Sequence, residues 1–140
     1  MATFNKFECF TEDLAEKVHN LGADTLKIAL TNTAPDGAAD AVLADITEIS
    51  AGNGYTAGGT AVTITSSAQT SGTYKLVGND IVFTASGGSI GPFRYAVFYN
   101  DSSTSDSLIG YWDYGSSITL ATGETLTVDL SPTNGILTIT

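Results

Sequence analysis

The first stretch of the chain carries apolar residues at helical spacing. Its apolar face contains Phe7, Phe10, Leu14, Val18 and Leu21, and its opposite face contains Glu8, Glu12, Glu16 and His19. Asn5 and Glu8 have the spacing of a capping box, and Gly22 suits a helix stop. The pattern predicts one N-terminal amphipathic helix at about residues 6–21, docked through its Phe/Leu face.

Beyond Gly22 the apolar positions alternate with polar ones, which is typical of strands with one buried face. The first such segment is 25–31. Further β-like segments, separated by turn signals, lie at 61–65, 73–77, 81–85, 93–99, 107–114, 117–120, 124–130 and 135–140. Short strands at this spacing with no helices between them predict an all-β protein: a sandwich, a jelly roll or a barrel.

The segments between these strands carry turn chemistry. Residues 32–41 contain Pro35-Asp36-Gly37, residues 42–49 suit one or two short helical turns, and residues 51–59 are rich in glycine. Gly78-Asn79-Asp80 suits a tight turn between two strands. Because no linker divides the chain, we expect a single domain over residues 1–140, with the β region at about 25–140.

Charge excludes several classes of partner. The chain has 15 acidic and 5 basic residues, a formal net charge of −10, and 21 Thr with 13 Ser. The bases are scattered: Lys6, Lys17, Lys27, Lys75 and Arg94. Nucleic acids and anionic membranes bind through clustered bases, so we expect neither as a direct partner. No apolar run is long enough to span a membrane, and no secretory signal is evident, which predicts synthesis and folding in the cytoplasm.

Motifs for catalysis are weak. Residues 87–91 match G-x-S-x-G around Ser89, but Pro92 and a β-like segment follow where a hydrolase elbow requires a helix. The single histidine, His19, lies upstream on the expected helix. A glycine-rich turn between strands is the preferred interpretation, and residues 52–59 likewise lack the spacing of a dinucleotide loop. We therefore expect no enzyme.

Metal and cofactor sites are equally weak. Cys9 is the one cysteine, so the chain has neither an internal disulfide nor a Cys/His zinc set. Glu12, Glu16 and His19 would share one helical face, and Asp101 and Asp106 share one loop. A solvated acidic face and an ordinary polar loop explain both groups. We expect no metal and no cofactor.

The aromatic residues beside the only arginine leave two interpretations open. Strict alternation places Phe93, Tyr95, Val97 and Tyr99 on one face of a strand and Arg94, Ala96 and Phe98 on the other. Arginine and aromatic residues are enriched at interface hot spots, which makes Arg94, Tyr111 and Trp112 candidate interface anchors. Alternatively, this is a core strand in which Arg94 pairs with a nearby acid such as Asp113.

Long segments of the chain resemble one known family. They are FTEDLAEKVHNLGADTLKIALTNTAPDGAADAVLADITEISAGNGYTAGG, SAQTSGTYKL, FTASGGSIGPFRYAVFYND and LIGYWDYGSSITLATGETLTVD. Together they cover nearly the whole chain. They are similar to bacteriophage capsid cement (decoration) proteins, like those of Bordetella-type short-tailed phages.

The resemblance implies a jelly-roll β-sandwich of about eight antiparallel strands with one N-terminal helix. It implies a structural virion protein on the outside of an icosahedral capsid, where it stabilises contacts between major capsid proteins of the HK97-like fold. It also implies a homodimer on the capsid. An alternative is a phage tail or receptor-binding β-sandwich that recognises host glycans, with Tyr111, Trp112, Asp113 and Tyr114 as candidate sugar contacts.

Overall fold

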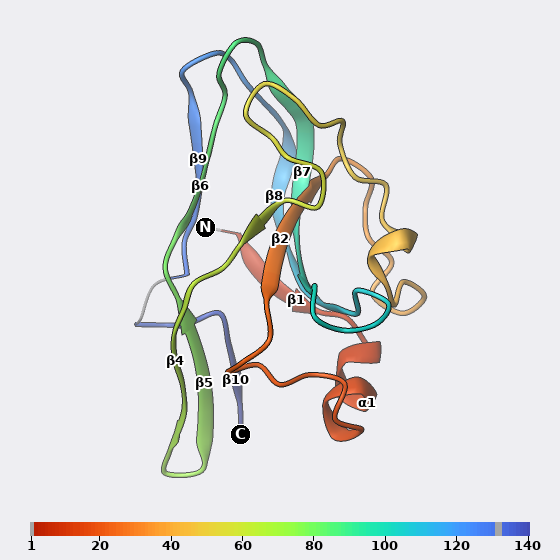
Figure 1. The fold of residues 1–140 in the computed structure, drawn as a ribbon, viewed down its shortest axis with the longest axis vertical. Helices are drawn as coiled ribbons and strands as arrows, with labels where there is room; N and C mark the ends of the chain where they lie inside the picture. The colour runs from red at the N-terminus through yellow and green to blue at the C-terminus, as the bar shows by residue number, and fades with distance from the viewer. Residues whose placement is uncertain (1, 131–132) are drawn as a thin grey trace.

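The chain is mostly β, as the alternation of its residues predicts. The computed structural model describes residues 2–130 and 133–140, with 47% of the chain in strands and 7% in helix. Every strand pair is antiparallel. Figure 1 shows the strands lying roughly along the long axis, with the helix at one end.

The largest sheet has five strands in the order β1-β8-β7-β2-β3. These strands are β1 (Thr3–Lys6), β8 (Leu108–Leu120), β7 (Ile90–Asn100), β2 (Leu26–Thr31) and β3 (Thr60–Ala61). The predicted strands at 107–114 and 117–120 are one strand, β8, because both parts pair with β7 along its length. The sheet therefore ends at β1 on one side and at β3 on the other.

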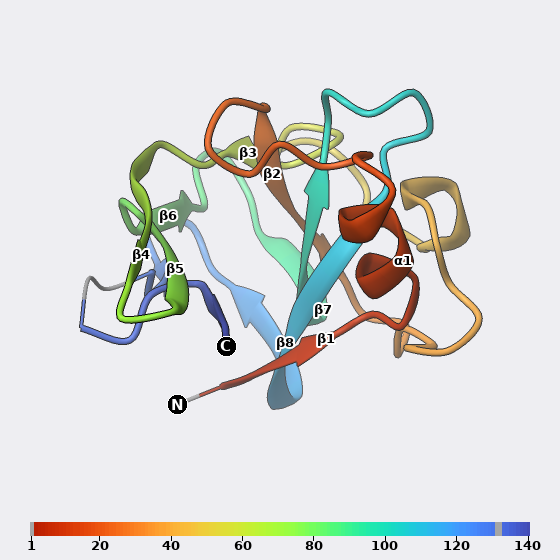
Figure 2. The ribbon, with the colours of Figure 1, turned by 90° about the horizontal axis from the view of Figure 1, so that it is seen from below.

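Two smaller sheets lie on one side of the large sheet (Figure 2). One has the order β10-β5-β4, and the other pairs β6 with β9. Their strands are β4 (Ile64–Thr70), β5 (Thr73–Gly78), β6 (Ile81–Thr84), β9 (Thr125–Val128) and β10 (Leu137–Ile139). The predicted tight turn at 78–80 joins β5 to β6, but these strands belong to different sheets and form no hairpin with each other.

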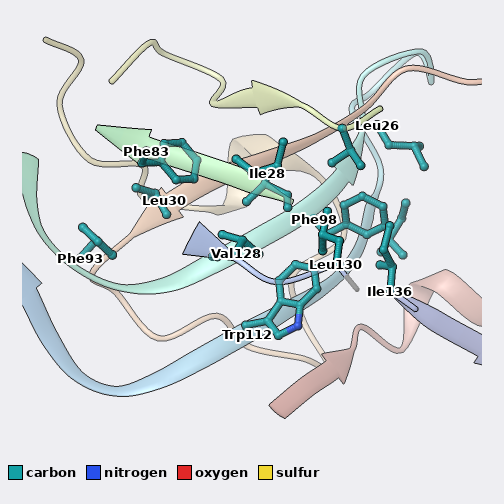
Figure 3. Packing of buried hydrophobic residues seen from close by; sticks show 14 of the residues in the cluster. Leu26, Ile28, Leu30, Phe83, Phe93, Phe98, Trp112, Val128, Leu130 and Ile136 are labelled. Carbon is teal, nitrogen blue, oxygen red and sulfur yellow. The ribbon is translucent and has the colours of Figure 1, made fainter. Parts of the chain in front are cut away.

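The main core lies between the large sheet and the two small ones. Figure 3 shows Ile28 and Leu30 of β2 in this core together with Phe83 of β6 and Val128 of β9. These four side chains are almost completely buried. We call this group of buried residues the inner cluster. Burial of such side chains is the main source of stability in a chain of this size.

A second, smaller core lies on the opposite face of the large sheet. Its buried members, which we call the outer cluster, are Phe7, Ala29, Val97, Tyr99 and Leu108. Leu43 and Ile46, from the short 3-10 helix η1 (Leu43–Asp45) and the residue after it, pack against this cluster. The helical turn predicted within 42–49 is thus present, and it covers the outer face of the sheet.

The N-terminal helix is much shorter than the sequence pattern predicts. Residues 3–6 form strand β1, and α1 spans only Cys9–Ala15. Phe7 continues the pairing of β1, because its N–H donates to the Ile109 carbonyl at 3.1 Å. After α1 the backbone turns at Lys17, where φ is +69°. The helical period was therefore wrong at both ends of the segment.

The expected apolar face of this helix is divided between the two cores. Phe10 and Leu21 are buried in the inner cluster, and Leu14 packs against it. Phe7 lies in the outer cluster, and Val18 is exposed. The pairing of β1 with β8 decides which of these residues enters which core. This pairing cannot be predicted from the helical spacing of the residues.

The strand alternation fails at Phe93. Phe93 lies in the inner cluster with Ala96 and Phe98, and not beside Val97 and Tyr99 as predicted. The register of β7 against β8 shifts between Phe93 and Tyr95. A bulge at this point inverts the faces, because one extra residue moves a side chain to the other side of a strand.

Candidate functional site: a groove between two sheet edges

An apolar groove opens where the large sheet ends at β1 and a small sheet ends at β10. It has a volume of about 720 Å³. Its lining includes Phe4 of β1, Trp112 and Tyr114 of β8, and Leu137 and Ile139 of β10. Figure 2 shows both chain ends on this side of the molecule. We call this feature the β1–β10 groove.

Aromatic rings form one wall of the groove. The rings of Phe4 and Trp112 lie 5.1 Å apart between centroids, in a tilted arrangement. Phe4 lies close against β8 because Gly110 has no side chain, and a Cβ there would collide with the Phe4 ring. Burial raises the pKa of the neighbouring Tyr114 phenol to about 12.

Within residues 2–130 and 133–140, strand β1 pairs with β8 on one side and has no strand partner on the other. The bond from the Phe7 N–H to the Ile109 carbonyl fixes the phase of the β1–β8 ladder. Hydrogen-bonded and non-bonded pairs alternate in an antiparallel ladder. Residues Phe4 and Lys6 therefore direct their N–H and C=O groups away from β8, at the edge of the sheet beside the groove.

The groove is the neutral part of an acidic protein. Among its fourteen lining residues, Lys6 is the one base and Asp129 is the one acid. Removing this pair from the totals of 15 acids and 5 bases leaves 14 and 4 elsewhere, so the net charge of −10 lies entirely outside the groove lining. The groove lining itself therefore carries no excess of positive or negative charge, which suits an uncharged partner.

The three predicted anchors do not form one patch. Trp112 is 7% exposed and lines the groove on the inner face of β8. Tyr111 packs on Phe7 of the outer cluster, with ring centroids 5.2 Å apart. Adjacent residues of a strand point to opposite faces, which separates Trp112 from Tyr111 and divides the proposed sugar contacts in the same way.

Arg94 forms the ion pair with Asp113 that one of the two interpretations predicts. Its guanidinium donates two hydrogen bonds to the Asp113 carboxylate, from Nε at 2.8 Å and from Nη2 at 3.1 Å. The guanidinium lowers the pKa of Asp113, chiefly through this hydrogen bond. The cation also lies 5.3 Å from the centre of the Tyr95 ring. Arg94 is thus bound within its own sheet.

The structure separates the residues of the hydrolase motif. Ser89 is exposed in the turn before β7, and strand β7 follows it without a helix. His19 contacts Asn100, the last residue of the same strand. A strand of this length keeps its ends roughly 30 Å apart. A proton transfer between Ser89 and His19 is therefore geometrically impossible in this fold.

The candidate metal ligands are also placed apart. Glu12 and Glu16 are exposed, whereas His19 is buried at 6% exposure and bonds to Asn100 through Nδ1 at 3.0 Å. Asp101 pairs with Lys27 at 3.2 Å. Within residues 2–130 and 133–140, no cluster of three His, Cys, Asp or Glu side chains has a metal-binding arrangement.

Cys9 packs against the outer cluster at the start of α1. Burial is the largest cause that raises the pKa of its thiol, and the nearby Asp13 carboxylate adds to the effect. A thiol with a raised pKa forms little thiolate and is a poor nucleophile.

No known protein family, curated protein or solved structure matches the chain. None of the helices in its described residues has the length and apolar character to cross a membrane.

Sequence reasoning missed most of the groove. Phe4, Leu137 and Ile139 were not predicted as site residues, and Tyr114 was predicted only as a sugar contact. The one local indication of strand β1 was that Phe4 and Lys6, two residues apart, would lie on the same face of a strand. The approach of β1 to β10 has no local signature.

Proposed function

We propose that the protein decorates and cements the outer surface of an icosahedral bacteriophage capsid. In this role it is a non-enzymatic virion protein, made in the host cytoplasm, that binds neighbouring major capsid subunits and a second copy of itself. We also propose that its antiparallel sheets form a jelly-roll sandwich. The sequence resemblance suggests this role, and the surface chemistry of the fold supports it.

The β1–β10 groove is the observation that carries this proposal. It combines an aromatic wall, a free strand edge and a neutral lining in a protein whose remaining surface is acidic. Apolar patches rimmed by polar residues mark interaction sites on soluble proteins. A cementing protein requires such contacts, because many weak identical contacts over a shell reinforce one another.

Two matched substitutions test the groove as the docking site. Ile139 lines the groove and is 37% exposed, whereas Val82 on β6 is 53% exposed and lies outside the groove lining. We expect Ile139→Asp to abolish co-sedimentation with undecorated short-tailed phage capsids and Val82→Asp to retain it. The two variants add the same charge. Equal binding by both would exclude the groove, and no binding by the parent protein would exclude the cement function.

Salt distinguishes buried surface from charge pairing in this binding. We expect capsid association to survive about 0.5 M salt, where the Debye length is only a few ångströms. Complete release between about 0.1 and about 0.5 M salt would show that charge pairing holds the protein on the capsid.

The glycan-binding alternative has one specific observation in its favour. Trp112 and Tyr114 share the groove with the polar residues Asn134 and Thr138, and sugars bind to such combinations of rings and hydrogen-bonding groups. Binding of the protein to a host-glycan array, together with absence from purified capsids, would favour this second function.

A further inference from the structure

The free edge of β1 and the groove lie side by side. Phe4 and Lys6 turn their main-chain groups to the edge and also line the groove with their side chains. A segment that bonds to this edge would therefore lie along the groove. Main-chain bonds at such an edge give affinity, and pockets for alternate side chains give specificity.

We propose that β1 accepts an extended, uncharged segment of the major capsid protein as an added strand, with alternate side chains of that segment in the β1–β10 groove. This inference rests on the proposed cement function and names the partner of its site. The segment becomes the new edge of the five-stranded sheet.

The pairing geometry defines the chemistry of the segment. Residues directly opposite each other in an antiparallel pair place their side chains on the same face of the sheet. The two segment residues opposite Phe4 and Lys6 would therefore point into the groove, which Trp112 also lines. The residue between them would lie on the outer face, beside Asn5. We expect apolar, polar, apolar at these three positions.

Charge favours a different protein over a second copy as the source of this segment. The groove lining is neutral, with Lys6 balanced by Asp129, so it suits an uncharged segment. A second copy would bring another chain of net charge −10 against an equally acidic surface. The segment in the groove therefore comes from the capsid subunit.

A matched pair of substitutions at Lys6 isolates the main-chain bond. Lys6→Pro removes an N–H that makes no bond to β8, and proline is tolerated on such an edge. Lys6→Thr keeps the N–H, and both variants lose the ammonium and its contact with the Thr11 hydroxyl. We expect Lys6→Pro to bind undecorated capsids about tenfold more weakly than Lys6→Thr, as for one lost hydrogen bond.

A capped peptide of sequence SVTVTVS provides a second readout without the capsid. We expect it to shift the amide resonances of Phe4 and Lys6 in the parent protein and to protect the single tryptophan, Trp112, from acrylamide quenching. Both variants lose the Lys6 ammonium from the groove lining, so they are compared with each other: both effects should persist in Lys6→Thr and be lost in Lys6→Pro. Melting curves of the two variants should coincide.

Several results would overturn the inference. Equal capsid binding by the two Lys6 variants would leave the cement function intact but exclude strand addition at β1. Unchanged resonances of Phe4 and Lys6 at about 1 mM peptide would also exclude it. A dimer of the parent protein that Lys6→Pro dissociates would assign the edge to a second copy. Peptide binding by a protein that never binds capsids would remove the capsid subunit as partner.

Discussion

The loop between β2 and β3 and the β1–β10 groove border the same sheet, and they differ in how their polar groups are satisfied. Residues 32–59 form a long irregular segment, yet buried side chains fasten it. Tyr55 accepts the Leu30 N–H at 3.0 Å and donates to Glu48 at 2.6 Å. Glu48 also accepts the Gly58 N–H at 2.7 Å.

The groove has the opposite organisation. Eight of its fourteen lining residues belong to strands, and within the described residues β1 ends the large sheet with no strand partner on its outer side. Apolar side chains line the groove beside this edge. Buried side-chain hydrogen bonds thus hold the irregular loop, whereas a regular strand, β1, forms an open sheet edge. The comparison teaches that a long loop can have its polar main-chain groups satisfied while a regular strand at a sheet edge leaves some without a partner.

The largest expected effect is on the closed region. Tyr99 is 1% exposed, belongs to the outer cluster and donates its hydroxyl to the Gly58 carbonyl. Tyr99→Ala should lower the free energy of unfolding by about 3–5 kcal/mol, because it leaves a cavity and frees the loop. Urea denaturation measures this value. A loss below about 1 kcal/mol would mean that the loop is not fastened through Tyr99.

Tyr55→Phe should have a smaller effect on the same loop. The substitution keeps the ring but leaves the Leu30 N–H and the Glu48 carboxylate without their shared hydroxyl. The free energy of unfolding should fall by about 1–3 kcal/mol, the typical cost of unsatisfied buried groups. Thermal unfolding followed by circular dichroism measures it, and an unchanged melting temperature would contradict the bridging role.

The buried histidine should make stability depend on pH. The Asn100 side-chain amide donates to Asp24 at 2.7 Å and to Nδ1 of His19 at 3.0 Å, so Nδ1 must be unprotonated. Burial is the main cause that lowers the pKa of His19, although Asp13 and Asp24 oppose it. The unfolded chain then binds more protons, so stability is full above about pH 6.5 and falls as the pH drops through the folded-state pKa.

Unfolding titrations at about pH 7.5 and about pH 5.5 measure this dependence. His19→Gln lacks the titrating ring, so its stability should change less between the two pH values. An identical change in the variant and the parent would assign the pH dependence to other groups.

The smallest expected effect on stability is in the open region. Ile139 lies at the end of β10 and is partly exposed, so Ile139→Asp should change the free energy of unfolding by no more than about 0.5 kcal/mol. Denaturant unfolding measures the stability of this variant, and the co-sedimentation assay measures its binding to capsids. A large loss of stability would show that Ile139 contributes to the core, which would contradict the contrast between the groove and the loop.

The sequence by itself determined the mostly β character of the chain. Alternation agrees with burial in β6, where Ile81 and Phe83 are buried and Val82 and Thr84 are exposed. The β-like segments also located β2, β5 and β7, although β2 and β7 carry buried side chains on both faces. The sequence also determined the charge: the net charge is −10, and the five basic residues are scattered along the chain. Arg94 and Asp113 were correctly paired as one of two readings.

Tertiary structure alone decided where the faces and edges lie. Phe7 and Phe10 fit one helical face, yet pairing of β1 with β8 sends them to different cores. The bulge after Phe93 moves its side chain to the opposite face of β7, although the sequence predicts regular alternation there. The groove exists because β1 and β10, from opposite ends of the chain, both end their sheets at the same place. Contacts between residues so distant in sequence leave no local periodicity, since hydrophobic pattern records burial and not the identity of the neighbour.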